Sequence, residues 1–420
     1  MSQNNNYFIS FMIWLSITMF YCYQYILRVL PNTIMPELMS QFNIGAAEFG
    51  TFAGIYYIGY IIIHIPIGIA LSKWGGKLVL PICISLTSLG LAPLLYSNNW
   101  NYVLLGRLMV GLGSSAAIVG ALQIFRMIFE KNFTRMLGIM VCFGLMTAVY
   151  VNKPLTQVIS MTGIKTVINV LMICGFALAA LTFFLIPSIT SDKQNESIWK
   201  SIKTIIFNYK LIYVSILAGL MVGPLEGFAD AWGSGFLNTV YNIERSIAGT
   251  IIASILTGMC VGCVVLPFIA DRANTYYTTT LISAVIMTGC FILLLAGYGN
   301  IFGVRIICLT IGIFCAYQVV IIAKISTFVP QNLSGMAAAI ANMIIMAFGS
   351  IFHTIIGNNM AKSWDGVSID GVRIYSKDAY IESISVIPAA MFIAIIGFII
   401  LIAAKTYRKK RLRNTSQTIA

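Results

Sequence analysis

Charge is scarce in this sequence. Only 9% of its 420 residues are Asp, Glu, Lys or Arg, whereas about a quarter are charged in a typical soluble domain. Apolar residues make up 59% of the chain and the mean hydropathy is +0.90. A soluble core of this length cannot bury so much apolar surface. The sequence therefore excludes a soluble globular protein and predicts a protein that crosses a membrane many times.

The sequence also lacks the residues on which most enzyme and pump chemistry depends. Its two histidines, His64 and His353, are far apart, and its nine cysteines lie almost entirely in apolar runs, so no metal-ligand spacing occurs. It contains no Gly-x4-Gly-Lys-Ser/Thr loop for ATP. We therefore expect neither an enzyme nor an ATP-driven pump, and no bound metal or cofactor.

Long apolar runs occupy most of the chain. A helix needs about 20 apolar residues to cross a hydrocarbon core of about 30 Å. The runs that meet this requirement predict an all-α membrane protein with twelve transmembrane helices, approximately at residues 9–34, 48–71, 79–97, 101–125, 135–158, 164–187, 209–234, 247–270, 278–297, 301–324, 335–358 and 384–404.

The net charge of +13 could indicate a nucleic-acid partner, but its distribution indicates a membrane orientation instead. Lys and Arg collect in alternate loops and in the tail, as they do on the cytoplasmic side of a bilayer. These residues are Lys73, Lys77, Arg126, Lys131, Arg135, Lys193, Lys200, Lys203, Lys210, Arg272, Lys405, Arg408, Lys409, Lys410, Arg411 and Arg413. We therefore expect both termini in the cytoplasm and no nucleic-acid partner. The Asn-x-Ser/Thr sequons fall on the same side, which favours a bacterial inner-membrane protein.

Landmarks of the first half recur about 198 residues later. Ser72 and Asp271 lie in similar loops 199 positions apart, and Arg107 and Arg305 lie in apolar runs 198 positions apart. Such spacing predicts an internal duplication, as in transporter folds, and hence two pseudo-symmetric six-helix bundles.

A polar break from Ser188 to Lys210 separates the two predicted bundles. We therefore expect an N-terminal bundle at 1–187, a cytoplasmic linker at 188–208, a C-terminal bundle at 209–404 and a basic cytoplasmic tail at 405–420.

The loop after the second run resembles a motif of the major facilitator superfamily. That family's loop between helices 2 and 3 is similar to Gly-x-x-x-Asp-Arg/Lys-x-Gly-Arg/Lys-Arg/Lys. Gly68, Lys73, Gly75 and Lys77 match it, whereas Ser72 replaces the acid. The resemblance extends over essentially the whole chain and implies that these residues form a cytoplasmic gate.

The corresponding loop of the second half departs from the motif differently. It keeps the acid and the base as Asp271 and Arg272, which the resemblance also assigns to the gate, but has Pro267 and Asn274 in the two glycine positions. The first loop therefore keeps the two glycines and lacks the acid, whereas the second loop keeps the acid and lacks the two glycines.

Ionisable residues inside a membrane are costly and mark functional sites. Arg28 lies in the first run, and Glu226 follows it by 198 positions, with Asp230 one turn further on. In the family that the chain resembles, helices 1 and 7 line the central cavity, so we expect Arg28 and Glu226 to bind solute and Glu226 and Asp230 to couple protons. Alternatively, Arg28 and Glu226 form a permanent ion pair that closes the outer gate, Arg28 snorkels to the headgroups, or Asp230 lies in the outer loop.

Further polar and aromatic residues in the spans are candidates for the same cavity. We expect Tyr25, Gln24, Trp232 and Gln318 to contact solute, and Arg107 to assist proton coupling, unless Arg107 snorkels. Pro224 is expected to weaken helix 7 beside the acids.

Together these features predict a secondary transporter of a small polar or zwitterionic solute, driven by protons or another coupling ion. The segments around Arg28 and Glu226 look like those of phagosomal-transporter-type carriers, which take up amino acids in intracellular bacteria. This resemblance implies uptake of an amino acid or short peptide by a monomer in the lipid bilayer. An exporter of a siderophore or drug with the same fold is the alternative, and a membrane sensor without transport is a second one.

The asymmetry of the two loops predicts that the second half carries most of the gate. We expect Asp271→Asn to slow transport several-fold and Ser72→Ala to change it little, measured as initial uptake rates in proteoliposomes. The opposite order of effects would contradict this.

Overall fold

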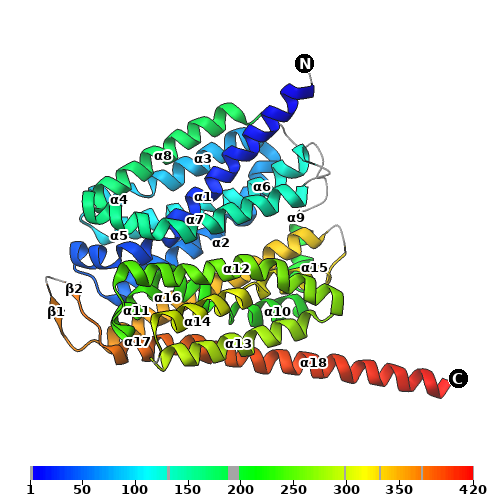
Figure 1. Cartoon of the computed structure of the whole chain (residues 1–420). Helices are drawn as coiled ribbons and strands as arrows, with labels where there is room; N and C mark the ends of the chain where they lie inside the picture. Colours follow the sequence, from blue (N-terminus) through cyan, green and yellow to red (C-terminus); the bar gives the residue numbers. More distant parts are fainter. Residues whose placement is uncertain are drawn as a thin grey trace.

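The computed structural model describes residues 3–129, 133–187, 198–297, 299–330, 333–369 and 372–419, and nearly all of them are helical (Figure 1). The first half contains α1 (Gln3–Phe42), α2 (Ala46–Trp74), α3 (Gly76–Leu89), α4 (Ala92–Tyr96), α5 (Trp100–Ser114), α6 (Ala116–Ile128), α7 (Phe133–Thr162) and α8 (Ile164–Leu185). Helix α9 (Ile198–Ile206) follows. The second half contains α10 (Tyr209–Gly219), η1 (Gly223–Trp232), α11 (Gly233–Tyr241), α12 (Arg245–Ala273), α13 (Tyr276–Leu295), α14 (Ile301–Cys315), α15 (Tyr317–Ser326), α16 (Ser334–Lys362), β1 (Ser368–Ile369), β2 (Val372–Arg373), α17 (Lys377–Ile384) and α18 (Val386–Ile419).

The predicted all-α membrane fold is confirmed. In the described part of the chain, ten helical segments are long and apolar enough to cross a bilayer, and two bent pairs raise the number to 12. The exception to helix among these residues is the short antiparallel pair β1–β2, in which Ser368 lies opposite Arg373.

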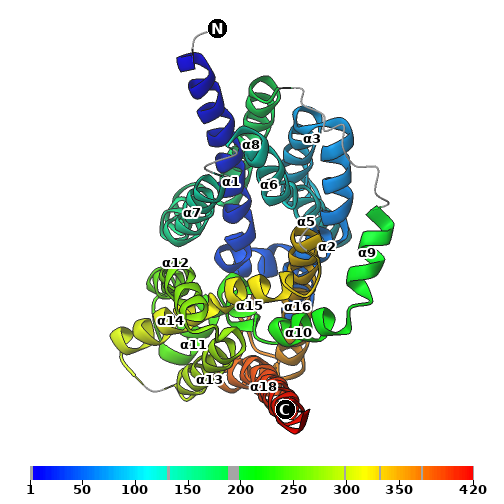
Figure 2. The same cartoon turned by 90° about the vertical axis from the view of Figure 1, so that its right-hand side faces the viewer.

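Two groups of helices face each other, α1–α8 above and α10–α18 below in Figure 1. They meet along α2 with α16 and along α7 with α12 (Figure 2). Helix α1 begins and α18 ends at one end of the molecule, here called the terminal end, where α9 also lies (Figure 1). The β1–β2 hairpin lies at the opposite end, here called the hairpin end.

Helix occurs in both the expected linker and the expected tail. Part of the expected linker, 188–197, lies outside the described residues, but the remainder forms α9. The expected tail, 405–420, continues α18 as helix to Ile419. Its Lys and Arg residues are good helix formers and no Pro or Gly interrupts them, so nothing in the sequence ends the helix at the membrane surface.

Close packing within each half depends on glycines that repeat with the predicted spacing. A Cβ atom on Gly59 of α2 would lie 2.5 Å from the carbonyl oxygen of Leu108 in α5. A Cβ atom on Gly258 of α12, 199 positions later, would lie 2.1 Å from the carbonyl oxygen of Leu309 in α14. Because any side chain would clash there, glycine lets both helix pairs pack backbone against backbone.

Positive φ angles recur at the same spacing. Asn43 and Asn242, at the ends of α1 and α11, have φ of 50° and 53°. Gly75 after α2 has φ of 77°, and Asn274 after α12 has φ of 51°. Asn274 adopts the left-handed α conformation that Asn reaches readily, with ψ of 41°, whereas Gly75 has ψ of 163°. The two turns therefore share a positive φ but not one conformation.

The seventh span, made of α10, η1 and α11, bends beside Glu226 and Asp230, as Pro224 predicts, but it stays helical. The pair of Tyr209–Gly219 with Gly223–Tyr241 is bent by 40°. The second segment begins with η1, a π-helix with Pro224 in its first turn, where a missing backbone N–H removes no hydrogen bond. The wider turns of η1 place Glu226 and Asp230 toward the first half.

The glycine contacts predict which substitutions destabilise the fold. Gly258→Ala should lower the free energy of unfolding by about 1–3 kcal/mol because the new methyl overlaps Leu309. Gly289→Ala, where a Cβ meets nothing within 4 Å, should be neutral or stabilise by up to about 1 kcal/mol. Thermal unfolding in detergent compares the two, and equal shifts in Tm would contradict the packing argument.

Candidate functional site

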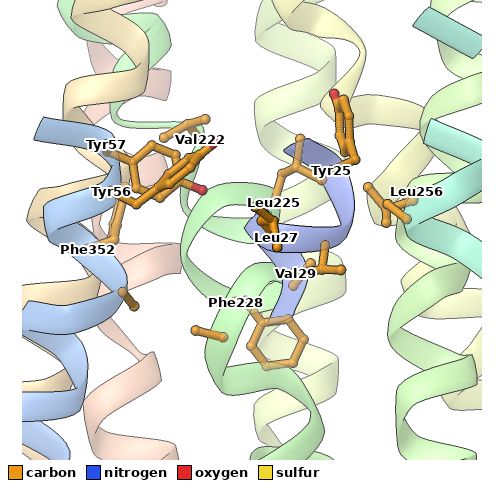
Figure 3. Packing of buried hydrophobic residues seen from close by; sticks show 14 of the residues in the cluster. Tyr25, Leu27, Val29, Tyr56, Tyr57, Val222, Leu225, Phe228, Leu256 and Phe352 are labelled. Atoms are coloured by element: carbon orange, nitrogen blue, oxygen red, sulfur yellow. The ribbon is translucent and has the colours of Figure 1, made fainter. Parts of the chain in front are cut away.

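One cation of the first half meets two carboxylates of the second half inside the membrane region. Arg28 of α1 donates from Nε to Asp230 Oδ2 at 2.8 Å and from Nη2 to Glu226 Oε2. Both acids come from η1, one turn apart. Figure 3 shows buried hydrophobic residues of α1, α2, η1, α12 and α16 that pack together, among them Leu27 and Leu225, the chain neighbours of Arg28 and Glu226. The duplication thus predicted the correct pair, and Asp230 joins it.

The ion cluster is almost completely removed from solvent. The side chains of Glu226 and Asp230 are 1% and 5% exposed, and that of Arg28 is 12% exposed. Arg28 therefore does not snorkel to the headgroups, and Asp230 does not lie in an outer loop. Charges buried in this way must be paired, because an isolated one costs several kcal/mol.

A tyrosine that the sequence analysis did not select completes the ion cluster. The Tyr57 hydroxyl of α2 donates to Glu226 Oε2 at 2.7 Å and also contacts Asp230 Oδ2. A sequence signal exists, since Tyr56, Tyr57, Tyr60 and His64 form a polar aromatic stripe at helical spacing on α2. The two halves are therefore joined here by an ion pair and by a hydroxyl.

Arg107 of α5 binds the backbone of α1, and its part in proton coupling stays a prediction. It is 5% exposed, so it does not snorkel, and it donates from Nη1 to the carbonyl oxygen of Leu27 at 2.7 Å. That carbonyl has no helical partner, because the residue four positions later is Pro31, which lacks an N–H. Arg107 also donates to the carbonyl of Arg28 at 3.4 Å. It thus holds the turn of α1 that carries Arg28.

A cavity of about 600 Å³ lies between the halves. It extends from Arg28 and Tyr57 to Leu137, Ala323 and Ala338, which lie close to the helix ends at the terminal end. Its lining combines tyrosines, amides and apolar side chains from α1, α2, α6, α7, α12, α15 and α16.

The predicted solute-contacting residues divide between this cavity and its surroundings. Arg28, Tyr25, Gln24 and Gln318 line the cavity. Gln24 accepts a hydrogen bond from the Tyr56 hydroxyl at 2.9 Å, and the Nε2 amide of Gln318 is buried without a hydrogen-bond partner in the described part of the chain. Neither Glu226 nor Asp230 is among the lining residues; both lie behind Arg28.

Trp232 does not line the cavity. It is fully buried and packs edge-to-face against Phe49 of α2, with 5.3 Å between ring centroids. The wide turns of η1 direct it toward the hairpin end rather than toward the cavity. Its contact with solute stays a prediction.

The halves are packed tightly together at the hairpin end. A Cβ atom on Gly357 of α16 would lie 2.5 Å from the carbonyl oxygen of Ala46, and one on Gly50 of α2 would lie 2.4 Å from that of His353. The N–H of Ala46 donates to the Tyr375 hydroxyl at 2.7 Å. Burial raises the pKa of Tyr375, so its phenol stays neutral. No side chain separates the helices at the glycines.

Polar contacts reinforce this closure from α1. Arg245 of α12 forms an ion pair with Glu37 at 3.3 Å and donates to the carbonyl of Thr33. The Asn32 side chain accepts from the N–H of Ser234 at 3.3 Å.

The predicted gate residues lie at or near the helix ends at the terminal end: Gly68 and Lys73 in α2, Gly75 between α2 and α3, Lys77 in α3, and Asp271 and Arg272 in α12. Gly75 provides the positive-φ turn described above, and Lys73 and Lys77 lie against the rings of Trp74 and Phe183. Gly68 is in α2, one turn before Leu71.

The second loop keeps its acid, but that acid is engaged within the loop. Asp271 accepts a hydrogen bond from the Tyr276 hydroxyl at 2.6 Å, and Arg272 is exposed. The Ser72 side chain lies outside the described part of the structure, so the comparison of the two loops stays a prediction.

His64, His353 and Arg305 have other surroundings. His64 lines the cavity, and its Nδ1 is 2.9 Å from the Ser115 hydroxyl. His353 is buried against the ring of Tyr57. Arg305, the counterpart of Arg107, is exposed and donates to Thr250 at 3.3 Å. Among the described residues no group of His, Cys, Asp and Glu is arranged to hold a metal ion.

The contrast between the two arginines gives a prediction with a matched control. Arg107→Gln should destabilise the protein by about 1–3 kcal/mol, because it leaves the buried Leu27 carbonyl unsatisfied, and should slow transport by displacing Arg28. Arg305→Gln should do neither. Tm and uptake rates of both variants test this, and a greater loss in the Arg305 variant would refute the assigned role.

The sequence and the fold can now be compared with known proteins. The family model of the Major Facilitator Superfamily matches residues 8–353. No curated protein sequence matches this chain. A mutant of the nucleoside transporter NupG is similar in structure, with a TM-score of 0.75 at 14% identity over 93% of this chain and 99% of that chain.

A second solved structure has the same architecture. It is a bacterial homologue of the human lysosomal transporter Spinster in an inward-facing, occupied conformation, with a TM-score of 0.72 at 15% identity over 94% of this chain and 97% of that chain. At such identities the likeness shows the fold alone. The family match over most of the length shows that this multi-pass membrane protein belongs to the Major Facilitator Superfamily and is a transporter rather than an enzyme.

Proposed function

We propose that the protein is a proton-coupled secondary transporter that takes up a small carboxylate-bearing solute, an amino acid or short peptide, by alternating access. One observation carries the proposal. Arg28 and Tyr57 of the first half both contact Glu226 and Asp230 of the second half, at the end of the cavity that lies away from the terminal end. The residues that detect solute and those that hold a proton are therefore the same residues that join the halves.

The packing of the halves supports alternating access. The cavity reaches the terminal end, while the hairpin end is closed by Gly50, Gly357 and the ion pair of Arg245 with Glu37. This is one of the two states that such a cycle requires. The basic loops favour a cytoplasmic terminal end in a bacterial inner membrane, so the cavity faces inward. The bundles at 1–187 and 209–404 then move as units within a monomer.

The ion cluster provides a physical reason for coupling. Opening the hairpin end separates Arg28 and Tyr57 from Glu226 and Asp230. Charges left unpaired in a low-dielectric interior cost several kcal/mol. A proton on one carboxylate, together with a solute carboxylate on Arg28, removes most of that cost. Proton and solute binding therefore favour each other.

The gate residues have a place in the other half of this cycle. When the terminal end closes, the loops that carry Lys73, Lys77, Asp271 and Arg272 approach each other. Asp271 then exchanges Tyr276 for a cationic or helix-end partner in the first half.

Export of a larger solute, such as a siderophore or drug, is the second candidate. One observation favours it: the cavity is lined mainly by apolar groups, including Leu122, Leu145, Met259 and Met346, and about 600 Å³ exceeds what a single amino acid fills. Net efflux of solute from loaded cells that maintain an inward proton gradient would support export, and net uptake would support import.

Neutralising the proposed proton site should uncouple transport. Glu226→Gln keeps the shape and hydrogen bonds of the side chain but carries no exchangeable proton. We expect pH-driven accumulation in proteoliposomes to fall at least about tenfold, the effect of losing about 1.4 kcal/mol of coupling, while solute exchange continues. Glu244→Gln, at an exposed acid, serves as the control. Intact pH-driven uptake by the Glu226 variant would sink the proposal.

A further inference from the structure

The charge that a solute meets in the cavity is positive. Among the described residues that line it, Arg28 is the one with a permanent charge, and no carboxylate is present. The Glu226 and Asp230 side chains lie behind Arg28 and are 1% and 5% exposed. A solute in this conformation can therefore form an ion pair with the guanidinium but cannot reach either acid.

A second donor lies in the wall of the same space. The Gln318 side chain of α15 lines the cavity and the residue is 6% exposed, yet its Nε2 amide has no hydrogen-bond partner in the described part of the chain. A buried amide that is left unpaired costs about 1–3 kcal/mol. When the Gln318 side chain turns its amide toward the cavity, an acceptor on the solute, such as a carboxylate or carbonyl oxygen, satisfies it.

The rest of the lining fits an apolar or aromatic body. Tyrosines at positions 21, 25, 56, 57 and 60 line the cavity together with aliphatic side chains. Tyr21 and Tyr25 pack edge-to-face with 5.2 Å between centroids, and the rings of Tyr25 and Tyr57 lie 5.5 and 5.7 Å from Arg28 Cζ. These rings are already engaged by a cation, which disfavours a second cation beside them.

We infer that the cavity recognises the carboxylate of its solute through Arg28 and Gln318, and that it does not recognise an amino group. The substrate class is a small carboxylic acid with an apolar or aromatic body, with or without an α-amino group. This inference rests on the proposed function and narrows it. Amino acids are accepted for their acid end, and deaminated acids of the same shape are accepted equally.

The summed charge of the buried residues relates this class of substrates to the coupled proton. Arg28, Arg107, Glu226 and Asp230 sum to zero when all are ionised. One bound proton makes the group positive by one, and one solute carboxylate restores neutrality. Transport of a simple carboxylate with one proton therefore moves no net charge, whereas transport of a zwitterionic amino acid with one proton moves one positive charge.

Three probes with one aromatic body separate the two ends of an amino acid. L-Phenylalanine has both charged groups, 3-phenylpropionate lacks the amine and phenethylamine lacks the carboxylate. Binding to the purified full-length protein is measured by calorimetry in detergent. We expect both acids to bind with affinities within about tenfold of each other, and phenethylamine to bind at least about tenfold more weakly, as the loss of a charged hydrogen bond requires. Phenethylamine binding as tight as that of the acids overturns the inference, as does the absence of saturable binding by either acid.

A matched pair of variants tests the second donor. Gln318→Leu keeps the approximate shape but removes the amide, and should weaken binding of 3-phenylpropionate by about three- to tenfold. Gln157→Leu, at an exposed position of α7, should leave it unchanged. If Gln318→Leu binds both acids as wild type does, the amide is not an anchor and that part of the inference is wrong.

Flux under an imposed membrane potential distinguishes this inference from the proposed coupling. At equal pH on both sides, an inside-negative potential should drive uptake of L-phenylalanine but not of 3-phenylpropionate. Equal stimulation of both contradicts the charge count. If no probe responds to pH or potential while the acids still bind preferentially, proton coupling fails and carboxylate recognition stands.

Discussion

The pairing of Arg28 with Glu226 and Asp230 is the interaction on which the rest of the structure depends. Three charges stand in a region where almost no others occur, and none of them is stable there alone. Since the cation belongs to one half and the acids to the other, their attraction holds the halves together at this depth. The surrounding packing excludes water and keeps the attraction strong. Any rearrangement of the halves must first provide these charges with other partners.

Much of the remaining architecture keeps that cluster in place. Pro31 interrupts the hydrogen bonds of α1 next to Arg28, and Arg107 repairs the interruption from α5. The π-helix η1 presents two acids one turn apart, and Tyr57 of the first half donates its hydroxyl to them. Glycines at Gly50 and Gly357 let α2 and α16 approach closely enough to seal one end. These features are local irregularities of helices, and they concentrate around the charges.

The sequence alone predicts the architecture because hydropathy and the spacing of duplicated landmarks are one-dimensional signals. The twelve spans and the pairing of Arg28 with Glu226 follow from them. The sequence did not reveal that Trp232 packs away from the cavity, because a π-helix rotates the residues that follow it relative to an α-helix, and no sequence rule gave that rotation. Tyr57 was missed for a related reason: which face of α2 meets η1 depends on how the halves dock. Arg107 and Arg305 match in sequence but not in environment, since duplication preserves position but not neighbours.

The hydrogen bonds from Arg107 to α1 have a mechanical consequence. Because Arg107 of α5 holds the carbonyls of Leu27 and Arg28, which lie on either side of the Arg28 Cα atom, the guanidinium cannot be withdrawn by bending α1 alone. In the proposed cycle, the guanidinium therefore moves with the whole first half as one unit. The distance from Arg28 to Glu226 and Asp230 then changes with the angle between the halves. A tilt of one half therefore changes the electrostatic potential at these two carboxylates.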